Sequence, residues 1–198
     1  MHESGKRSAA EGGGYWIIGF YSMPRPSNSR FFTKSTRIES GAFANCWSLT
    51  NFTFPENLSY IGSNAFFYIS GPASITIPSS VKEMESCAFH GLENLKSVTV
   101  NSGAHVGTSA FMLNKNLSTV TIKNGAFIEV GAFEYLENLT NVVIEDNVVL
   151  GAYAFSHSSK SLREMQVRIG KNVTIGGNAF QYNGVKTVQI GEGAKIEN

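Results

Sequence analysis

Few residues in this 198-residue sequence have the types and spacing that catalysis needs. The four histidines are scattered and Asp146 is the only aspartate. No serine or cysteine stands in a motif that places a general base beside a nucleophile. We therefore expect no acyl-transfer centre, and we expect His90 and His157 to be surface residues near turns.

Two carboxylate pairs, Glu83/Glu85 and Glu145/Asp146, are candidates for glycoside hydrolysis or calcium binding. Neither pair recurs along the chain, so solvated charge explains them better. Gly176-Gly177 lacks the Lys-Ser/Thr of a phosphate-binding loop, and Cys46 and Cys87 have neither metal-ligand nor disulfide spacing. The sequence thus predicts a non-enzymatic chain with no metal and no cofactor; the alternative is an enzyme completed by another domain.

Charge and hydropathy exclude two partner classes. The net charge is +1 and no stripe of Lys and Arg is present, so we expect no nucleic-acid binding. The apolar run at residues 15–21 is too short to cross a bilayer and lacks a signal-peptide cleavage pattern, so we expect no membrane insertion. Residues 1–37 are predicted to be poorly ordered, with the apolar run as a candidate cap.

The sequence contains a repeat, and this repeat determines where any functional residue lies. An Ala-Phe pair recurs at intervals of 22–25 residues, which is typical of stacked leucine-rich-repeat units that cannot bury an apolar face alone. The pairs are Ala42-Phe43, Ala65-Phe66, Ala88-Phe89, Ala110-Phe111, Ala132-Phe133, Ala154-Phe155 and Ala179-Phe180. The sequence predicts a solenoid of about seven units over residues 38–198.

Each unit also contains an alternating apolar pair, which predicts a strand with one buried face. The pairs are Phe52/Phe54, Ile75/Ile77, Val98/Val100, Val120/Ile122, Val142/Ile144, Met165/Val167 and Val188/Ile190. Relative to the Phe of their units, Met165/Val167 lies one residue late and Val188/Ile190 one residue early. Residues 156–161 are predicted to form a surface bulge. These strands predict one parallel β-sheet.

A hydroxyl residue stands three positions before several of the phenylalanines. Ser40, Ser63, Ser86 and Thr108 are predicted to be N-caps, so that the Ala-Phe pair opens a short helical turn with the Phe pointing inward. Gly62, Gly107, Gly151 and Gly176 are predicted to permit a sharp bend into that turn. The predicted fold is therefore an α/β horseshoe-like leucine-rich repeat solenoid.

The residue between the two inward positions of each strand points outward, and a parallel sheet stacks these residues into one row. The predicted ligand-binding row is Thr53, Thr76, Thr99, Thr121, Val143, Gln166 and Gln189. A threonine ladder also favours sheet formation whatever its function. The flanking positions Asn51, Ser74, Ser97, Thr119, Asn141 and Thr187 complete the predicted platform.

Several phrases resemble one family. Residues 41–50 (GAFANCWSLT) and residues 75–81 (ITIPSSV) resemble the BspA-like leucine-rich repeat. The strand-ending proline is present only at Pro55 and Pro78, and the cysteine position of the family is kept only at Cys46. The solenoid is predicted to be incomplete at its C-terminus, because no polar cap follows Ile196.

The resemblance implies a cell-surface or secreted protein that binds a protein or glycoprotein ligand in adhesion or cell-cell interaction. The alternative is a structural spacer in a larger surface protein, which a lack of aromatic residues on the sheet face favours.

Overall fold

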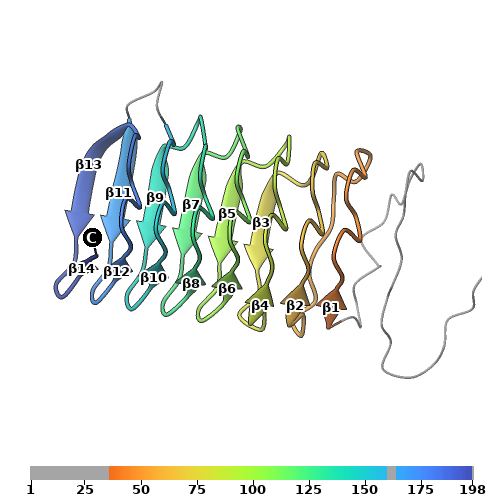
Figure 1. The fold of residues 1–198 in the computed structure, drawn as a ribbon, viewed down its shortest axis with the longest axis horizontal. Helices are drawn as coiled ribbons and strands as arrows, with labels where there is room; N and C mark the ends of the chain where they lie inside the picture. Colours follow the sequence, from red (N-terminus) through yellow and green to blue (C-terminus); the bar gives the residue numbers. More distant parts are fainter. Residues whose placement is uncertain (1–35, 160–163, 198) are drawn as a thin grey trace, which may run out of the picture.

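The computed structural model describes residues 36–159 and 164–197, which wind into a solenoid of stacked coils (Figure 1). Residues 1–35 of the predicted N-terminal segment lie outside the described residues, and Arg37 and Ile38 already form strand β1. From β2 (Tyr60–Ile61) onward each coil has one longer and one two-residue strand, whereas the segment between β1 and β2 contains no longer strand. The longer strands are β3 (Ser74–Ile77), β5 (Ser97–Val100), β7 (Thr119–Ile122), β9 (Asn141–Ile144), β11 (Met165–Ile169) and β13 (Val185–Ile190).

The longer strands pair in parallel in the order β13-β11-β9-β7-β5-β3, as the alternating pattern predicts. The prediction of a single sheet is wrong, however, because the short strands form two further parallel sheets, β14-β12-β10-β8-β6 and β1-β2-β4. These strands contain the apolar residue five positions before each Phe, which therefore has backbone partners as well as core contacts. The short strands are β1 (Arg37–Ile38), β2 (Tyr60–Ile61), β4 (Glu83–Met84), β6 (His105–Val106), β8 (Phe127–Ile128), β10 (Val149–Leu150), β12 (Thr174–Ile175) and β14 (Lys195–Ile196).

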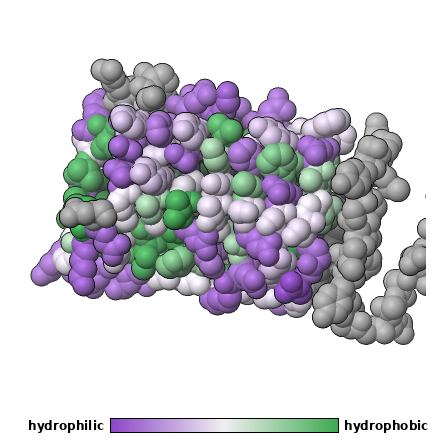
Figure 2. Space-filling view, viewed as in Figure 1, coloured by the Kyte–Doolittle hydropathy of each residue, from purple (hydrophilic) through white to green (hydrophobic). Residues whose placement is uncertain are grey.

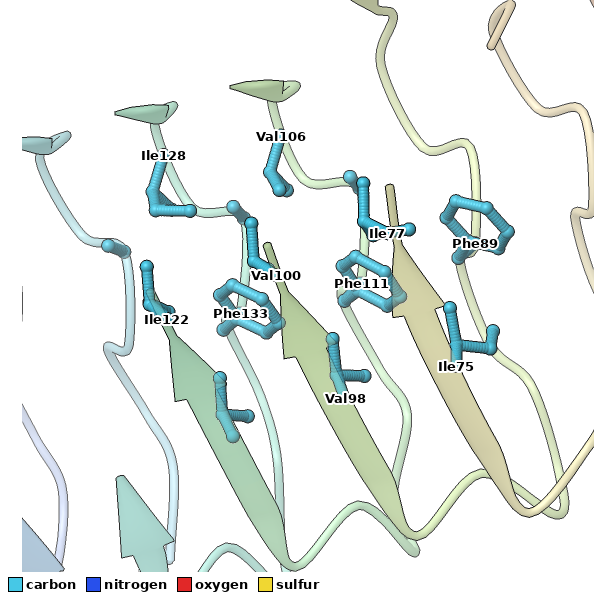
Figure 3. Close-up of a cluster of buried hydrophobic side chains, with 14 of the residues drawn as sticks. Ile75, Ile77, Phe89, Val98, Val100, Val106, Phe111, Ile122, Ile128 and Phe133 are labelled. Carbon is cyan, nitrogen blue, oxygen red and sulfur yellow. The ribbon is translucent and has the colours of Figure 1, made fainter. Parts of the chain in front are cut away.

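The core is a column of phenylalanine rings that runs along the solenoid. Consecutive rings, from Phe43 to Phe180, stack at centroid distances of 4.9–5.3 Å with interplanar angles of at most 12°. Figure 3 shows aliphatic side chains of β3, β5 and β7, among them Ile75 and Val100, pointing toward Phe89, Phe111 and Phe133. Because the coil spacing matches the stacking distance of aromatic rings, one Phe per coil makes a continuous core.

The predicted helical turns are absent: the described residues contain no helix, and the Ala-Phe pairs lie in turns. The reason is that alternate amides of these turns donate to the next coil, and only the amides between them donate back to the carbonyl three residues earlier in their own turn. Asn64 N donates to Ser86 O at 3.1 Å, Phe66 N to Ala88 O at 2.8 Å and Tyr68 N to His90 O at 2.9 Å. Left-handed residues two positions before and after the Phe, Asn64 and Tyr68 in this coil, also stop helical dihedrals. Correspondingly, no helix of the described residues is long and apolar enough to cross a bilayer.

The glycines before these turns do not have the predicted role of allowing a bend. A Cβ at Gly151 would lie 2.7 Å from the carbonyl carbon of Glu129 and 2.8 Å from Val130 N, both in the preceding coil. The same crowding by neighbouring backbone occurs at Gly62, Gly107 and Gly176. Glycine is therefore needed here because two coils approach closely.

The last coil leaves apolar side chains exposed. Val188, Ile190 and Ile196 are 51%, 53% and 70% exposed, whereas the equivalent Val167 and Ile169 of the preceding coil are buried. Apolar side chains also gather at this end of the molecule in the space-filling view (Figure 2).

Candidate functional site

The outer face of the six-stranded sheet holds the predicted ligand-binding row. The strands pair in register, so one outward residue from each strand stands beside its neighbours. The row consists of Thr76, Thr99, Thr121, Val143, Arg168 and Gln189. Thr99, Thr121 and Val143 are half-buried between their neighbours, while Thr76, Arg168 and Gln189 are exposed.

Two members of the predicted row were wrong. Thr53 is exposed but precedes β3 in a segment that is not a strand, so the described sheet does not include it. Gln166 pairs with Asn141 and Thr187 in the flanking row, and Arg168 takes the predicted place of Gln166. The insertion before β11 shifts the strand by three residues, not one, so that the inward pair equivalent to Val142/Ile144 is Val167/Ile169.

The flanking row lies two residues closer to the N-terminal ends of the strands. Its members are Ser74, Ser97, Thr119, Asn141, Gln166 and Thr187. The predicted member Asn51 is exposed and lies before the first strand of the sheet. Apart from Val143, the two rows present hydroxyls, amides and the single cation of Arg168. These groups form hydrogen bonds but place no acid beside a base.

The carboxylate of Glu85 fastens three coils together. It accepts hydrogen bonds from Ser63 N at 2.9 Å, Ser63 Oγ at 2.7 Å, Tyr60 Oη at 2.8 Å and Ser40 Oγ at 3.3 Å. These donors, chiefly the Ser63 hydroxyl, lower the pKa of Glu85 from 4.5 to about 2. The predicted N-caps Ser40 and Ser63 therefore donate to a carboxylate in a later coil instead of capping a helix.

Glu129 repeats this arrangement two coils later. It accepts from Thr108 N at 2.8 Å, Thr108 Oγ1 at 2.6 Å and His105 Nε2 at 2.8 Å. Burial raises the pKa of Glu129, but the bonds from Thr108 and His105 outweigh it and the net shift is downward. Both carboxylates hold neighbouring coils in register and are occupied by these bonds.

The predicted carboxylate pairs do not converge on a common centre. Glu145 accepts a hydrogen bond from Asn124 N of the preceding coil, whereas Asp146 accepts one from Lys171 N of the following coil. Glu83 lies exposed beside the occupied Glu85. Because the members of each pair have different partners, neither pair has the geometry of a glycosidase or a calcium loop.

Sequence reasoning missed one cluster, formed by Glu134, Ser156 and His157. Ser156 Oγ donates to Glu134 Oε1 at 2.7 Å, and His157 Nδ1 lies 3.2 Å from Ser156 Oγ and 3.4 Å from Glu134 Oε1. Both oxygens meet the same imidazole nitrogen and the serine is fully buried, which is not the arrangement of a catalytic triad. Glu134 and Ser156 each follow the Phe of adjacent units, and that shared position is the signal that they are neighbours.

The two histidines predicted to lie on the surface are more enclosed than expected. His90 is buried, its Nδ1 has no hydrogen-bond partner, and burial lowers the pKa of its imidazole. Its ring stacks on Phe67 at 5.0 Å. His157 is half-buried between Tyr135 and Tyr182, at 4.8 and 5.0 Å. Both histidines therefore belong to aromatic stacks between coils.

Metal chemistry finds no support in the part of the chain that the structure describes, where no group of three or more His, Cys, Asp and Glu residues could hold an ion. Cys46 and Cys87 are free thiols, and burial raises the pKa of each. Cys46 is half-buried and packs against the core.

Four exposed aromatic side chains lie in the turns and loops outside the strands of the six-stranded sheet. Trp47, Tyr68, Tyr135 and Tyr182 are 71%, 45%, 38% and 62% exposed. The three tyrosines stand two positions after the Phe of their coils and have φ values of 48–57°. We call these four residues the aromatic edge.

Comparison with known proteins shows which protein family this chain belongs to. A family model described as the BspA type leucine rich repeat region, in six copies, matches residues 36–162 and 105–198. A leucine-rich repeat protein of known crystal structure from Bacteroides ovatus is 20% identical, with a TM-score of 0.49, over 83% of this chain and 53% of that one. This chain spans about half the length of that protein, and no curated protein matches it. The two family matches together cover the whole described solenoid, so the chain belongs to the BspA type leucine-rich repeat family.

Proposed function

We propose that this chain is a non-enzymatic binding module that recognises a protein or glycoprotein at a cell surface or after secretion, in adhesion or cell-cell interaction. The observation that carries the proposal is the outer face of the six-stranded sheet, where two rows of side chains, hydrogen-bonding except for Val143, are exposed or half-buried among the described residues. Such a rigid platform accumulates many weak contacts without a cofactor. Membership of the repeat family supports this interaction role.

The outer face of the sheet is too small to form a stable protein interface by itself. Six strands about 4.8 Å apart and four residues of about 3.3 Å give a face of about 24 by 13 Å, or about 300 Å². A stable interface takes about 800 Å² from each partner. A protein partner therefore also contacts the loops that adjoin the sheet.

The test is a binding screen of the full chain against extracellular-matrix and cell-surface proteins by surface plasmon resonance. Lysines in place of Thr76, Thr99 and Thr121 should abolish specific binding, because three long charged side chains interrupt the flat row. The matched control replaces Ser79, Ser102 and Asn124, exposed residues of the turns that follow the same strands, with lysine. Equal binding by both triple variants, each folded by circular dichroism, would refute the sheet face as the site.

A spacer function is the second candidate. Its support is that the row of outward residues on the sheet contains no aromatic residue and one arginine, whereas binding hot spots are rich in Trp, Tyr and Arg. A screen that finds no partner for the full chain would favour the spacer over the binding module.

A further inference from the structure

A groove at the aromatic edge lies outside the sheet face and has no part in the proposed function above. It has a volume of about 410 Å³ and crosses four successive coils. With a coil spacing of about 4.8 Å, it is about 14 Å long. Trp47, Tyr68 and Leu113 line it together with the polar side chains of Glu93, Lys115 and Asn116. These dimensions suit a short linear ligand.

A missing side chain opens the groove. Gly91 occupies the position of Tyr68 and Tyr135 in its own coil, with φ of +69°. A Cβ there would lie 2.7 Å from Cε1 of Tyr68, so any larger residue would displace the tyrosine ring and fill the space beside it. The floor is apolar, because Ile69 and Leu92 are each only 1% exposed.

The floor of the groove is not part of a strand, and three of its amides are already paired within the solenoid. Gly91 N donates to Met112 O at 3.0 Å, Leu92 N to Asn114 Oδ1 at 2.7 Å and Glu93 N to Ile69 O at 3.3 Å. A ligand is therefore recognised chiefly by side chains. This condition disfavours an extended peptide, which binds chiefly through its main chain.

The side chains that remain form a set that suits sugars. The exposed rings of Trp47 and Tyr68 offer flat apolar surfaces on which the C–H face of a pyranose can stack. The carboxylate of Glu93 is an acceptor with no hydrogen-bond or ion-pair partner among the described side chains, and Lys115 is a donor, so both can bind hydroxyls. Lys115 also forms an exposed ion pair with Glu137 at 3.2 Å. This region carries no net positive charge to attract an anionic sugar.

We propose that this groove binds a neutral oligosaccharide of two or more pyranose rings through aromatic stacking on Trp47 and Tyr68 and hydrogen bonds to Glu93 and Lys115. The site is separate from the sheet face. A glycan can therefore bind here whether or not a protein partner binds there.

The test uses the full chain and a panel of neutral trisaccharides, namely cellotriose, chitotriose, maltotriose and mannotriose, measured by saturation-transfer NMR and titration calorimetry. At least one trisaccharide should bind, and Trp47→Ala and Tyr68→Ala should each weaken that binding at least tenfold. Glu93→Gln should weaken it less, because the amide still accepts a hydrogen bond. The matched control is Tyr182→Ala, which removes an exposed tyrosine from the same coil position outside the groove and should leave binding unchanged.

Three results would overturn the proposal: no binding by any neutral trisaccharide, equal loss in Tyr68→Ala and Tyr182→Ala, or preference for sialyllactose or for a tetrapeptide library over the neutral sugars. The lysine variant of Thr76, Thr99 and Thr121 should bind the trisaccharide normally. The two sites therefore fail independently, and loss of protein binding leaves the glycan proposal standing.

Discussion

Replacing Gly151 with alanine tests whether close approach of two coils is the reason for glycine before the Ala-Phe turn. Without a clash, alanine should stabilise the chain by about 0.4–1 kcal/mol, because it restricts the unfolded state. In the structure the new Cβ would lie 2.7 Å from the carbonyl carbon of Glu129 and 2.8 Å from Val130 N. Both are backbone atoms, which cannot move aside as the end of a flexible side chain can. Overpacking of this kind costs about 1–3 kcal/mol.

The coil must shift to relieve that contact, which also weakens the hydrogen bond from Gly151 N to Ile128 O, 2.7 Å long and worth about 1 kcal/mol. Subtracting the unfolded-state gain leaves a net loss of about 1–3 kcal/mol. Urea unfolding followed by far-UV circular dichroism measures this loss as a lower midpoint.

The matched control is Gly125→Asn. Gly125 has φ of +66° and no atom within 4 Å of an added Cβ, and the equivalent positions of the next two coils are Asn147 and Asn172, also with positive φ. Asparagine tolerates this conformation, so its free energy of unfolding should stay within about 0.5 kcal/mol of the parent. A Gly151→Ala variant as stable as the parent, or more stable, would refute the close-approach argument.

Two further predictions concern polar groups between coils. Since the pKa of Glu85 is about 2 in the folded chain and 4.5 when unperturbed, its charge stabilises the fold above pH 4.5, and this stabilisation is lost as the pH falls toward 2. Glu85→Gln should therefore be less stable than the parent at pH 7, on the order of 1 kcal/mol after screening of the half-exposed carboxylate, and urea midpoints measured across this window should converge at low pH. The fully buried Asn114 accepts from Leu92 N at 2.7 Å and donates to Phe89 O and Phe111 O. Asn114→Leu should lower the free energy of unfolding by at least about 1–3 kcal/mol, because Leu92 N loses its partner; an unchanged urea midpoint would contradict this role.

The repeat period and the inward residues were predictable from sequence because they depend on local periodicity. The Phe column follows directly from the Ala-Phe spacing, and the outward row is correct from Thr76 to Val143. The sequence did not predict that Arg168, and not Gln166, lies in the outward row. The register of a strand after an insertion is set by pairing with the previous coil. The pattern contains no information about how much of the insertion the loop absorbs.

The turns were harder to predict for a related reason. Ser63 and Thr108 have the residue types and positions of N-caps, but the partners of their hydroxyls, Glu85 and Glu129, lie one unit later in the sequence. Helix signals are read within one segment, whereas these backbone and side-chain bonds join neighbouring coils. The Ser156 cluster escaped notice in the same way, and alignment of equivalent positions between units is the procedure that exposes such pairs.

The nearly constant separation between bonded residues also has a consequence for how the chain folds. Hydrogen bonds between side chains and neighbouring coils mostly join residues 21–25 apart, near both ends and in the middle. The entropy lost in closing each successive loop is therefore nearly the same, and each coil needs only the one before it as a template. Growth can follow the order of synthesis, with each new coil docking as it leaves the ribosome. Folding time should then increase by one similar step per added repeat, without a search that widens with chain length.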